Sequence, residues 1–352
     1  VTYYDVNPRY TKLHSLLKRE KPVEGLVFGS CVSSTLDPNT LTEVSGRNFF
    51  NFSTHISLTR EPKAFLERIV KEGVPVRQVL LNVDNYLRIN ELPDESEETQ
   101  IRRPMNARWP HAYGVNSAMD FYGPYLFGWV GLHSSLVTLW HHAQGKLPPV
   151  IEREDGFWDW KAGLTMAKEE PEKLAAEILS VAAQRRPMTE RPAPESLKSF
   201  EDLQALASLT RKRGMTLTCF IPPSWALRPT FPWQGEYSEW QLTQLLKTCG
   251  EFYDFRLYND KTFDIREFIT YENFTPHFGD IIAHTIFKGE NKRYAYKVTP
   301  ENLPQYLAFK RNEAAIFERE IFPHLKEYTA KQVLSPEFRA LAEKFPAPPE
   351  AR

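Results

Sequence analysis

The sequence has almost no excess charge of either sign, and this absence excludes two simple modes of binding. Its 352 residues include 44 Lys and Arg against 45 Asp and Glu, for a formal net charge of -1. A protein that binds nucleic acid through phosphates needs surplus cations to displace counterions, and so does one that binds an anionic membrane surface. We therefore expect no nucleic-acid partner and no electrostatic attachment to a membrane.

Cysteine and long apolar runs are also scarce. The three cysteines, Cys31, Cys219 and Cys249, are too few and too odd in number for a disulfide framework. We expect Cys219 in the core and Cys249 at a helix end, with no partner that the sequence identifies. The most apolar stretch, 125–140, is shorter than the roughly 20 residues of a membrane-spanning helix. The opening VTYYDVNPRY lacks the features of a signal peptide, so we expect a processing site or an artificial boundary there.

Short apolar runs alternate with amphipathic helical patterns along the chain. The strand-like runs are 25–30, 48–53, 78–84, 216–223 and 252–257. The helical patterns cover 58–73, 197–214 and 239–249, and another follows Gly279. Strands separated by helices predict a parallel sheet covered on both faces. We therefore expect an α/β protein with a doubly wound, flavodoxin-like parallel sheet.

A long insertion divides the predicted core. Residues 85–215 separate the third strand from the fourth, which is more than a loop. The expected organisation is an α/β core at 1–84 and 216–302 and a mostly helical insertion or cap subdomain at 85–215. A helical extension at 303–352 then follows the core.

The carboxyl end of the first predicted strand carries a family resemblance. FGSCVSSTLDP (28–38) is similar to the opening block of SGNH/GDSL-type hydrolases, in which a Gly-Asp-Ser or Gly-Ser-Ser turn presents a nucleophilic serine. Further blocks follow in the expected order, at 7–13, 48–58, 79–87, 155–160 and 271–282. Together they cover roughly residues 7–320 and resemble the branch of envelope proteins related to alginate O-acetylation and lipoteichoic-acid D-alanylation. The resemblance implies an SGNH-hydrolase-like fold.

The catalytic positions of the resemblance hold unusual residues. Cys31 stands where the family has its serine. Anchoring the last block on Gly279 places Asn273 in the histidine position and Thr270 in the acid position. A shifted register uses His277 as the histidine instead. In the first register the usual Ser-His-Asp triad is absent.

The oxyanion block also departs from the family. The Gly-x-Asn-Asp pattern falls on Asn82–Asn85, so Asp84 stands where the oxyanion-stabilising Asn belongs. The resemblance makes Ser30, Asn82 and Asn85 the candidate turn and oxyanion residues.

Topology indicates a substitute arrangement. In a flavodoxin-like order the second and third strands flank the first, and the crevice opens at their carboxyl ends. His55 follows the second strand and Asp84 closes the third, so both are placed to flank Cys31. We hypothesise a Cys31-His55-Asp84 arrangement, with a helix N-terminus lowering the pKa of the thiol. The structural alternatives are a packed cysteine, a loop histidine, a capping aspartate and, at Asn273, a turn residue.

Two function classes follow. One is an esterase or acyltransferase of SGNH type that acts on an envelope polysaccharide or a small acyl ester, with a membrane-bound acyltransferase as partner. The other is a catalytically inactive relative that binds glycan or serves in assembly. The resemblance implies an extracytoplasmic location and an N-terminal anchor outside this chain. We expect no cofactor and no metal, because the adjacent His141 and His142 diverge by about 100° on a helix and lack neighbouring ligands.

Overall fold

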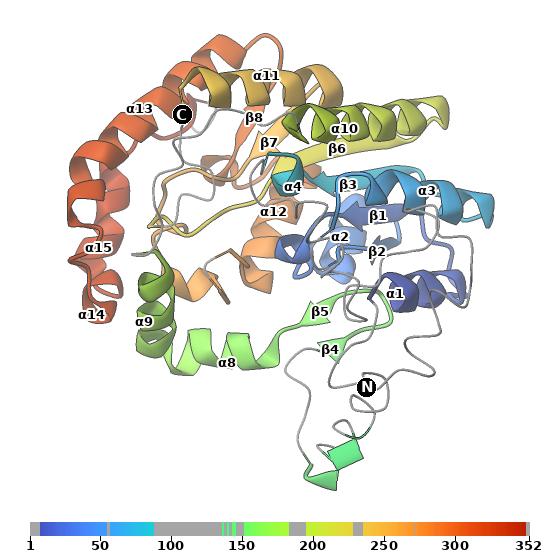
Figure 1. Ribbon diagram of the computed structural model, residues 1–352, viewed down its shortest axis with the longest axis horizontal. Coiled ribbons are helices and arrows are strands. Elements are labelled where there is room, and N and C mark those ends of the chain that lie inside the picture. The colour runs from blue at the N-terminus through green and yellow to red at the C-terminus, as the bar shows by residue number, and fades with distance from the viewer. Residues whose placement is uncertain are drawn as a thin grey trace.

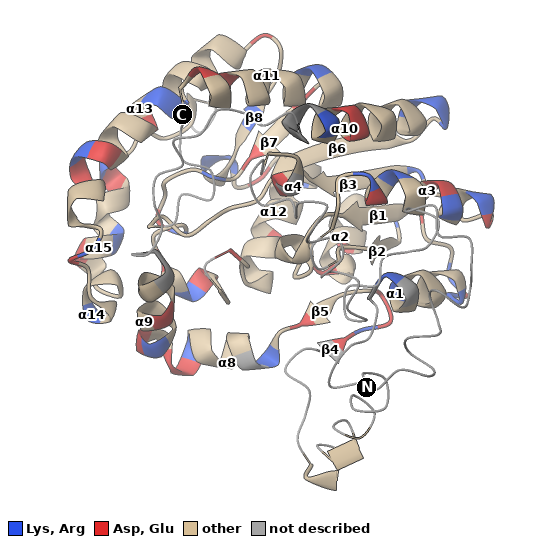
Figure 2. Ribbon diagram, viewed as in Figure 1, with Lys and Arg blue, Asp and Glu red and all other residues tan. Residues whose placement is uncertain are grey.

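The computed structural model shows an α/β fold built on a six-stranded, mostly parallel sheet (Figure 1). It describes residues 8–54, 57–87, 136, 139–140, 143–145, 151–182, 195–227, 235–270 and 272–349. Figure 2 shows acidic and basic residues interspersed along α3, α10 and α13, as the balanced composition predicts.

The sheet has the strand order β2-β1-β3-β6-β7-β8. All pairs are parallel except β7 with β8, which is antiparallel. Hence β1 lies between β2 and β3, and their carboxyl ends meet at one edge. The strands are β1 (Gly25–Phe28), β2 (Phe49–Asn51), β3 (Gln78–Asn82), β6 (Thr216–Ile221), β7 (Phe252–Asp254) and β8 (Tyr296–Val298).

Helices cover both faces of the sheet, because successive strand residues point to opposite sides. On one face Leu26 and Phe28 pack in a cluster with residues of α1, α3, α10 and α11, and on the other Val27 packs with α2 and α12. The helices are α1 (Pro8–Leu17), α2 (Pro38–Ser45), α3 (Glu61–Lys71), α4 (Asp84–Leu87), α10 (Glu195–Lys212), α11 (Glu236–Cys249) and α12 (Pro276–Lys288).

The described part of the insertion has its own local structure. It contains the two-stranded antiparallel hairpin β4 (Ile151–Glu152) and β5 (Trp158–Asp159), then α8 (Lys161–Glu169) and α9 (Pro171–Ala182). In contrast, α10 at its end packs on α3, α11 and β6 and therefore covers the sheet.

The C-terminal extension is helical where it is described. It contains α13 (Leu303–Glu320), α14 (Ala330–Val333) and α15 (Pro336–Ala340). In Figure 1 these helices descend along one side of the molecule, and α14 lies against α9.

Two sequence expectations need correction. The edge strand β8 was not predicted, and it makes the sheet mixed rather than wholly parallel. Cys249 does have a partner, since it forms a disulfide with Cys219 across a Cα–Cα distance of 6.3 Å. The reason is topological: α11 leads into β7, and Cys219 of β6 is the register partner of Phe252 at the start of β7. Among the described residues, no helix is long and apolar enough to cross a membrane.

Candidate functional site

The turn after β1 carries Cys31. Ser30 precedes a short 3-10 turn, Cys31–Ser33, and its side chain accepts a hydrogen bond from the backbone N–H of Val32. Glycine is required at position 29, because a Cβ there would lie 2.5 Å from Ser33 Oγ and 2.6 Å from Asn82 Cβ. Cys31 is partly exposed and is not part of a disulfide. The turn therefore presents a thiol at the carboxyl edge of the sheet.

Polar side chains join this turn to the end of β3. Ser30 Oγ donates to Asp84 Oδ2 at 2.8 Å, and the N–H of Asp84 donates to Asn82 Oδ1 at 2.9 Å. Asn82 Nδ2 lies 3.4 Å from Ser33 Oγ. All four side chains are buried. Ser30, Asn82 and Asp84, which were predicted to lie near one another, are therefore joined by hydrogen bonds. These bonds hold the Cys31 turn against the end of β3.

The end of β2 is fastened to the same turn. Asn51 Nδ2 donates to the carbonyl oxygens of Ser33 and Leu36 at 2.8 and 2.9 Å. The hydroxyls of Ser33 and Ser53 lie 2.9 Å apart. The β1 turn is therefore held from both neighbouring strands.

A buried lysine connects α1 to this edge. Lys12 Nζ donates to the carbonyl oxygens of Asn51, Ser53 and Gly156 at 3.0, 2.7 and 2.7 Å. It also lies 4.8 Å from the centre of the Trp158 ring. Burial lowers the pKa of Lys12 from 10.5 to about 8. Lys12 thus links α1, the end of β2 and the β4–β5 hairpin through one ammonium group.

The β4–β5 hairpin lies against the Cys31 turn. The N–H of Trp158 donates to the carbonyl of Ser34 at 3.1 Å, and Trp160 Nε1 donates to Ser34 Oγ at 3.2 Å. Ser34 Oγ in turn donates to the carbonyl of Cys31 at 2.6 Å. Part of the insertion is therefore built into the site.

The first turns of α12 pack against the loop between β1 and α2 and against α2 itself. A Cβ on Gly279 would lie 3.1 Å from the carbonyl oxygen of Thr35, so α12 approaches the β1–α2 loop closely. One residue later, Asp280 Oδ1 accepts a hydrogen bond from Thr40 Oγ1 of α2 at 2.7 Å. The last sequence block thus lies beside the first.

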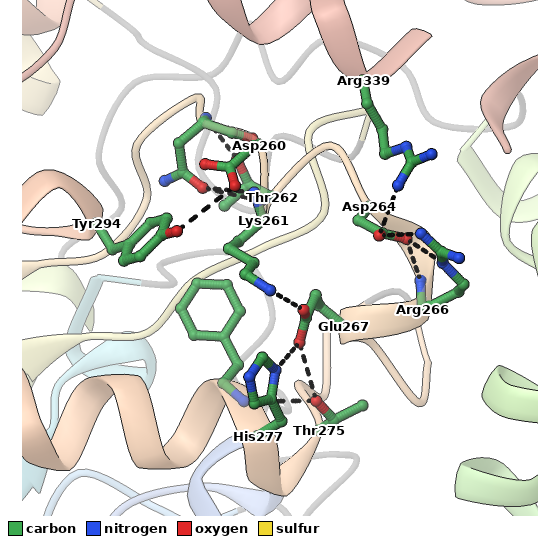
Figure 3. Close-up of polar contacts among 12 residues, drawn as sticks. Asp260, Lys261, Thr262, Asp264, Arg266, Glu267, Thr275, His277, Tyr294 and Arg339 are labelled. Carbon is green, nitrogen blue, oxygen red and sulfur yellow. Dashed lines mark hydrogen bonds and ion pairs between the residues drawn. The ribbon is translucent and has the colours of Figure 1, made fainter. Parts of the chain in front are cut away.

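A polar cluster surrounds Glu267 just ahead of α12 (Figure 3). Glu267 ends the 3-10 turn Ile265–Glu267, and its side chain is 10% exposed. Its Oε1 accepts from Lys261 Nζ at 2.6 Å, and its Oε2 lies 2.8 Å from His277 Nδ1 and 3.4 Å from Thr275 Oγ1. The His277 side chain is 62% exposed. The cluster holds one imidazole in a fixed orientation at the first turn of α12.

The remaining predicted site residues are a buried turn residue and two positions whose side chains lie outside the described part of the chain. Asn273 is buried in a turn, where its carbonyl accepts from the N–H of Ile269 at 2.7 Å and its own N–H donates to Thr270 Oγ1 at 3.2 Å. His55 and the Asn85 side chain lie outside the described residues. The role of His55 in the Cys31-His55-Asp84 hypothesis therefore stays a prediction. Asp84 accepts a hydrogen bond from Ser30.

The sequence analysis expected a helix N-terminus at Cys31, and the structure has only a short turn there. Cys31 opens a turn of only 3 residues, and the next helix, α2, begins at Pro38 behind its own N-cap Asp37. A single turn aligns too few peptide dipoles to act as a helix N-terminus.

Sequence reasoning missed Glu267, Lys12 and Trp160. Glu267 lies ten positions before His277, outside the quoted block. Lys12 and Trp160 were inside quoted blocks, but lysines are almost never fully buried unless paired, and nothing local marks their contacts.

Within the described parts of the chain, no group of three or more His, Cys, Asp or Glu side chains is placed to hold a metal ion. Comparison of the chain with family models, curated proteins and solved structures finds no match in any of the three.

Proposed function

We propose that the protein is an SGNH-hydrolase-like enzyme of acyl transfer or ester hydrolysis, with Cys31 as the nucleophile. The observation that carries this proposal is the convergence of distant segments on the turn after β1. Residues of 7–13, 48–58, 79–87 and 155–160 contact one another or the 28–38 turn through the hydrogen bonds described above. The block 271–282 reaches the same turn where Gly279 packs against the Thr35 carbonyl. These are the same six blocks on which the sequence resemblance rests. Parallel α/β sheets bind ligands at the carboxyl ends of their strands, and the Cys31 turn lies at that edge of the sheet.

The chemistry requires a thiolate and a proton acceptor. The thiol proton passes to a base, and the sulfur attacks the carbonyl carbon of an ester, forming a C–S bond. The leaving alkoxide takes the proton from the base and departs as an alcohol. A water molecule or a polymer hydroxyl then attacks the thioester, gives its proton to the base, and releases the acyl group as acid or ester while the thiolate takes the proton back.

The disulfide supports an extracytoplasmic location. Buried Cys219 and partly buried Cys249 form a disulfide, and disulfides persist mainly in oxidising compartments. An envelope polysaccharide as acyl acceptor and a membrane-bound acyltransferase as partner fit that location, and they rest on the sequence resemblance. Mass analysis of the unreduced protein tests the disulfide. Forming one disulfide removes two hydrogen atoms, so the mass should be about 2 Da lower than that of the chain with three free thiols.

An aryl-acetate assay tests the catalytic proposal. The parent protein, Cys31→Ala and Cys31→Ser are compared for release of acetate from an aryl ester and for thioester formation by mass spectrometry of the unquenched protein. We expect a covalent acyl adduct on Cys31 in the parent and loss of both adduct and turnover in Cys31→Ala. Turnover that survives Cys31→Ala removes Cys31 from the mechanism.

A second candidate function is non-catalytic glycan binding. The observation that favours it is Asn273, which stands in the family's histidine position and serves there as a buried turn residue. This candidate predicts that parent and Cys31→Ala bind an acetylated envelope polysaccharide equally well in calorimetry, with no acetate released by either.

A further inference from the structure

Three large apolar side chains of the insertion are exposed to solvent. Leu136, Leu139 and Trp140 are 54%, 64% and 65% exposed, and all three residues have helical backbone. Because residues three and four positions apart lie on the same side of a helix, these side chains share one surface, which we call the 136–140 face. Among the described residues, the other exposed large apolar side chains, Leu17 and Phe322, stand far from this face in the sequence. Grouped exposed apolar side chains mark a contact with a partner or a membrane.

The sequence around the 136–140 face contains no charged residue. Residues 121–145 include no Asp, Glu, Lys or Arg, although 25% of the whole chain is charged. At that average, a stretch of this length would hold about six charges. The same stretch contains six aromatic residues, two of them tryptophan. The face therefore belongs to a segment from which charge is excluded and in which aromatic residues are concentrated.

This composition favours lipid over protein as the occupant of the face. Protein interfaces are enriched in Arg as well as in aromatic residues, and they have a polar rim. The boundary of a bilayer penalises every charged side chain that enters it, and it concentrates Trp and Tyr at the level of the head groups. A contact of this kind needs no surplus of cations, which agrees with the balanced charge of the chain.

The 136–140 face also lies where a flat surface can reach it. In Figure 1 the teal and green segment around 136–145 is at the lower end of the view, away from the six-stranded sheet and the helices that cover it. The chain then reaches the β4–β5 hairpin, which starts at Ile151 and bonds to the Cys31 turn through Trp158. A bilayer can therefore contact the face without meeting the α/β core.

We propose that the 136–140 face is a membrane contact in which Leu136, Leu139 and Trp140 enter the boundary between the head groups and the acyl chains of a zwitterionic bilayer. The leucines bury apolar surface among the acyl chains, and the indole lies at the level of the head groups. The apolar run 125–140 is shorter than a spanning helix, so the contact is made with one leaflet. This inference goes beyond the proposed acyl transfer and does not depend on it.

Flotation with phosphatidylcholine vesicles tests the proposal. The parent protein, Leu139→Ser and Trp140→Ser are compared at about 0.1 and 0.5 M NaCl, because salt weakens electrostatic attachment but not apolar insertion. Phe322→Ser is the matched control, since Phe322 is 50% exposed in the 3-10 turn Phe322–His324, outside the uncharged segment. All the substituted side chains are exposed, so thermal melts should show the same folded state in parent and variants.

We expect the parent to float with the vesicles at both salt concentrations. Either substitution in the face should lower the partition coefficient about tenfold, because each removes one large apolar side chain from the lipid. Phe322→Ser should keep the parent value. Brominated phosphatidylcholine should quench part of the tryptophan fluorescence of the parent, and this quenching should fall in Trp140→Ser while the other seven of the 8 tryptophans remain.

Several results would overturn the proposal. These are a parent that does not float, flotation that the higher salt abolishes, and flotation that both face variants retain at the parent value. Equal losses in Phe322→Ser and in the face variants would also overturn it, because binding would then not be specific to the face. If the parent dimerises in sedimentation velocity, Trp140→Ser is monomeric and neither floats, the occupant is a second copy of the chain rather than lipid. None of these variants alters the Cys31 turn, so the aryl-acetate assay is decided separately.

Discussion

Replacing Lys12 with methionine tests how the candidate site is held together. The Lys12 side chain is fully buried, and its ammonium donates to three carbonyl oxygens from the end of β2 and from the hairpin. Methionine has a similar length and no donor. The substitution therefore removes the bonds while it keeps most of the packing.

The expected loss at pH 7 is the difference between two opposing contributions. Three hydrogen bonds from a charged donor contribute about 1.5 kcal/mol each, or about 4.5 kcal/mol together. Burial lowers the pKa of Lys12 from 10.5 to about 8, so burying the ammonium costs about 3.5 kcal/mol at about 1.4 kcal/mol per pH unit. Methionine avoids that cost. We expect Lys12→Met to lower the free energy of unfolding by about 1 kcal/mol at pH 7.

The loss should grow with pH. Between pH 8 and 10.5 the unfolded parent keeps the Lys12 proton while the folded parent gives it up. The unfolded state then binds more protons, so the stability of the parent rises with pH in this window. Lys12→Met has no such group. Its deficit relative to the parent should therefore grow by about 2.5 kcal/mol and reach about 3.5 kcal/mol at pH 10. Glu152 and Asp155, which favour the charged form, are present in both proteins.

Urea denaturation followed by circular dichroism at pH 7, 8, 9 and 10 measures this difference. Lys63→Met serves as the control, because Lys63 forms an exposed ion pair with Glu67 one helical turn away, and such pairs contribute little. A deficit in Lys12→Met that stays constant or shrinks above pH 8 would refute the reasoning, since it would mean that folded Lys12 keeps its proton.

Two further substitutions probe the fold. Asp254→Asn should cost about 3 kcal/mol at pH 7, because it removes the buried carboxylate that pairs with Arg256, whose side chain is only 13% exposed. The pKa of Asp254 is lowered to about 2 by Arg256 against the effect of burial, so the deficit relative to the parent should shrink as the pH falls from 4 to 2 in denaturant titrations. Gly156→Ala should lower the melting temperature far more than Gly214→Ala, since both have positive φ but only the former places a Cβ 2.1 Å from the Asn51 carbonyl; equal shifts would contradict this.

Much of the sheet was predictable from local patterns. The runs at 25–30, 78–84 and 216–223 correspond to β1, β3 and β6, although each strand ends sooner than its apolar run. The prediction failed for β8, which has only 3 residues and includes Lys297. So short a segment carries too little pattern, and its pairing with β7 depends on where the preceding helix returns the chain.

The candidate site was predictable only in part. Ser30 and Cys31 were placed by the resemblance, and Asp84 was placed beside Cys31 because parallel strands bring their carboxyl ends to one edge. Asn273 was placed by resemblance, and the structure uses it in a turn. Glu267 was missed because a carboxylate in a short 3-10 turn looks like any surface residue until His277 is seen beside it.

The local sequence determines most of the strands and helices, because apolar periodicity is a property of neighbouring residues. It also determines which polar residues follow the strands. The tertiary structure decides which of those polar groups come into contact and which hydrogen bonds they form. Lys12 bonds to a carbonyl 144 positions away, and a buried ammonium must find acceptors wherever the packed chain supplies them.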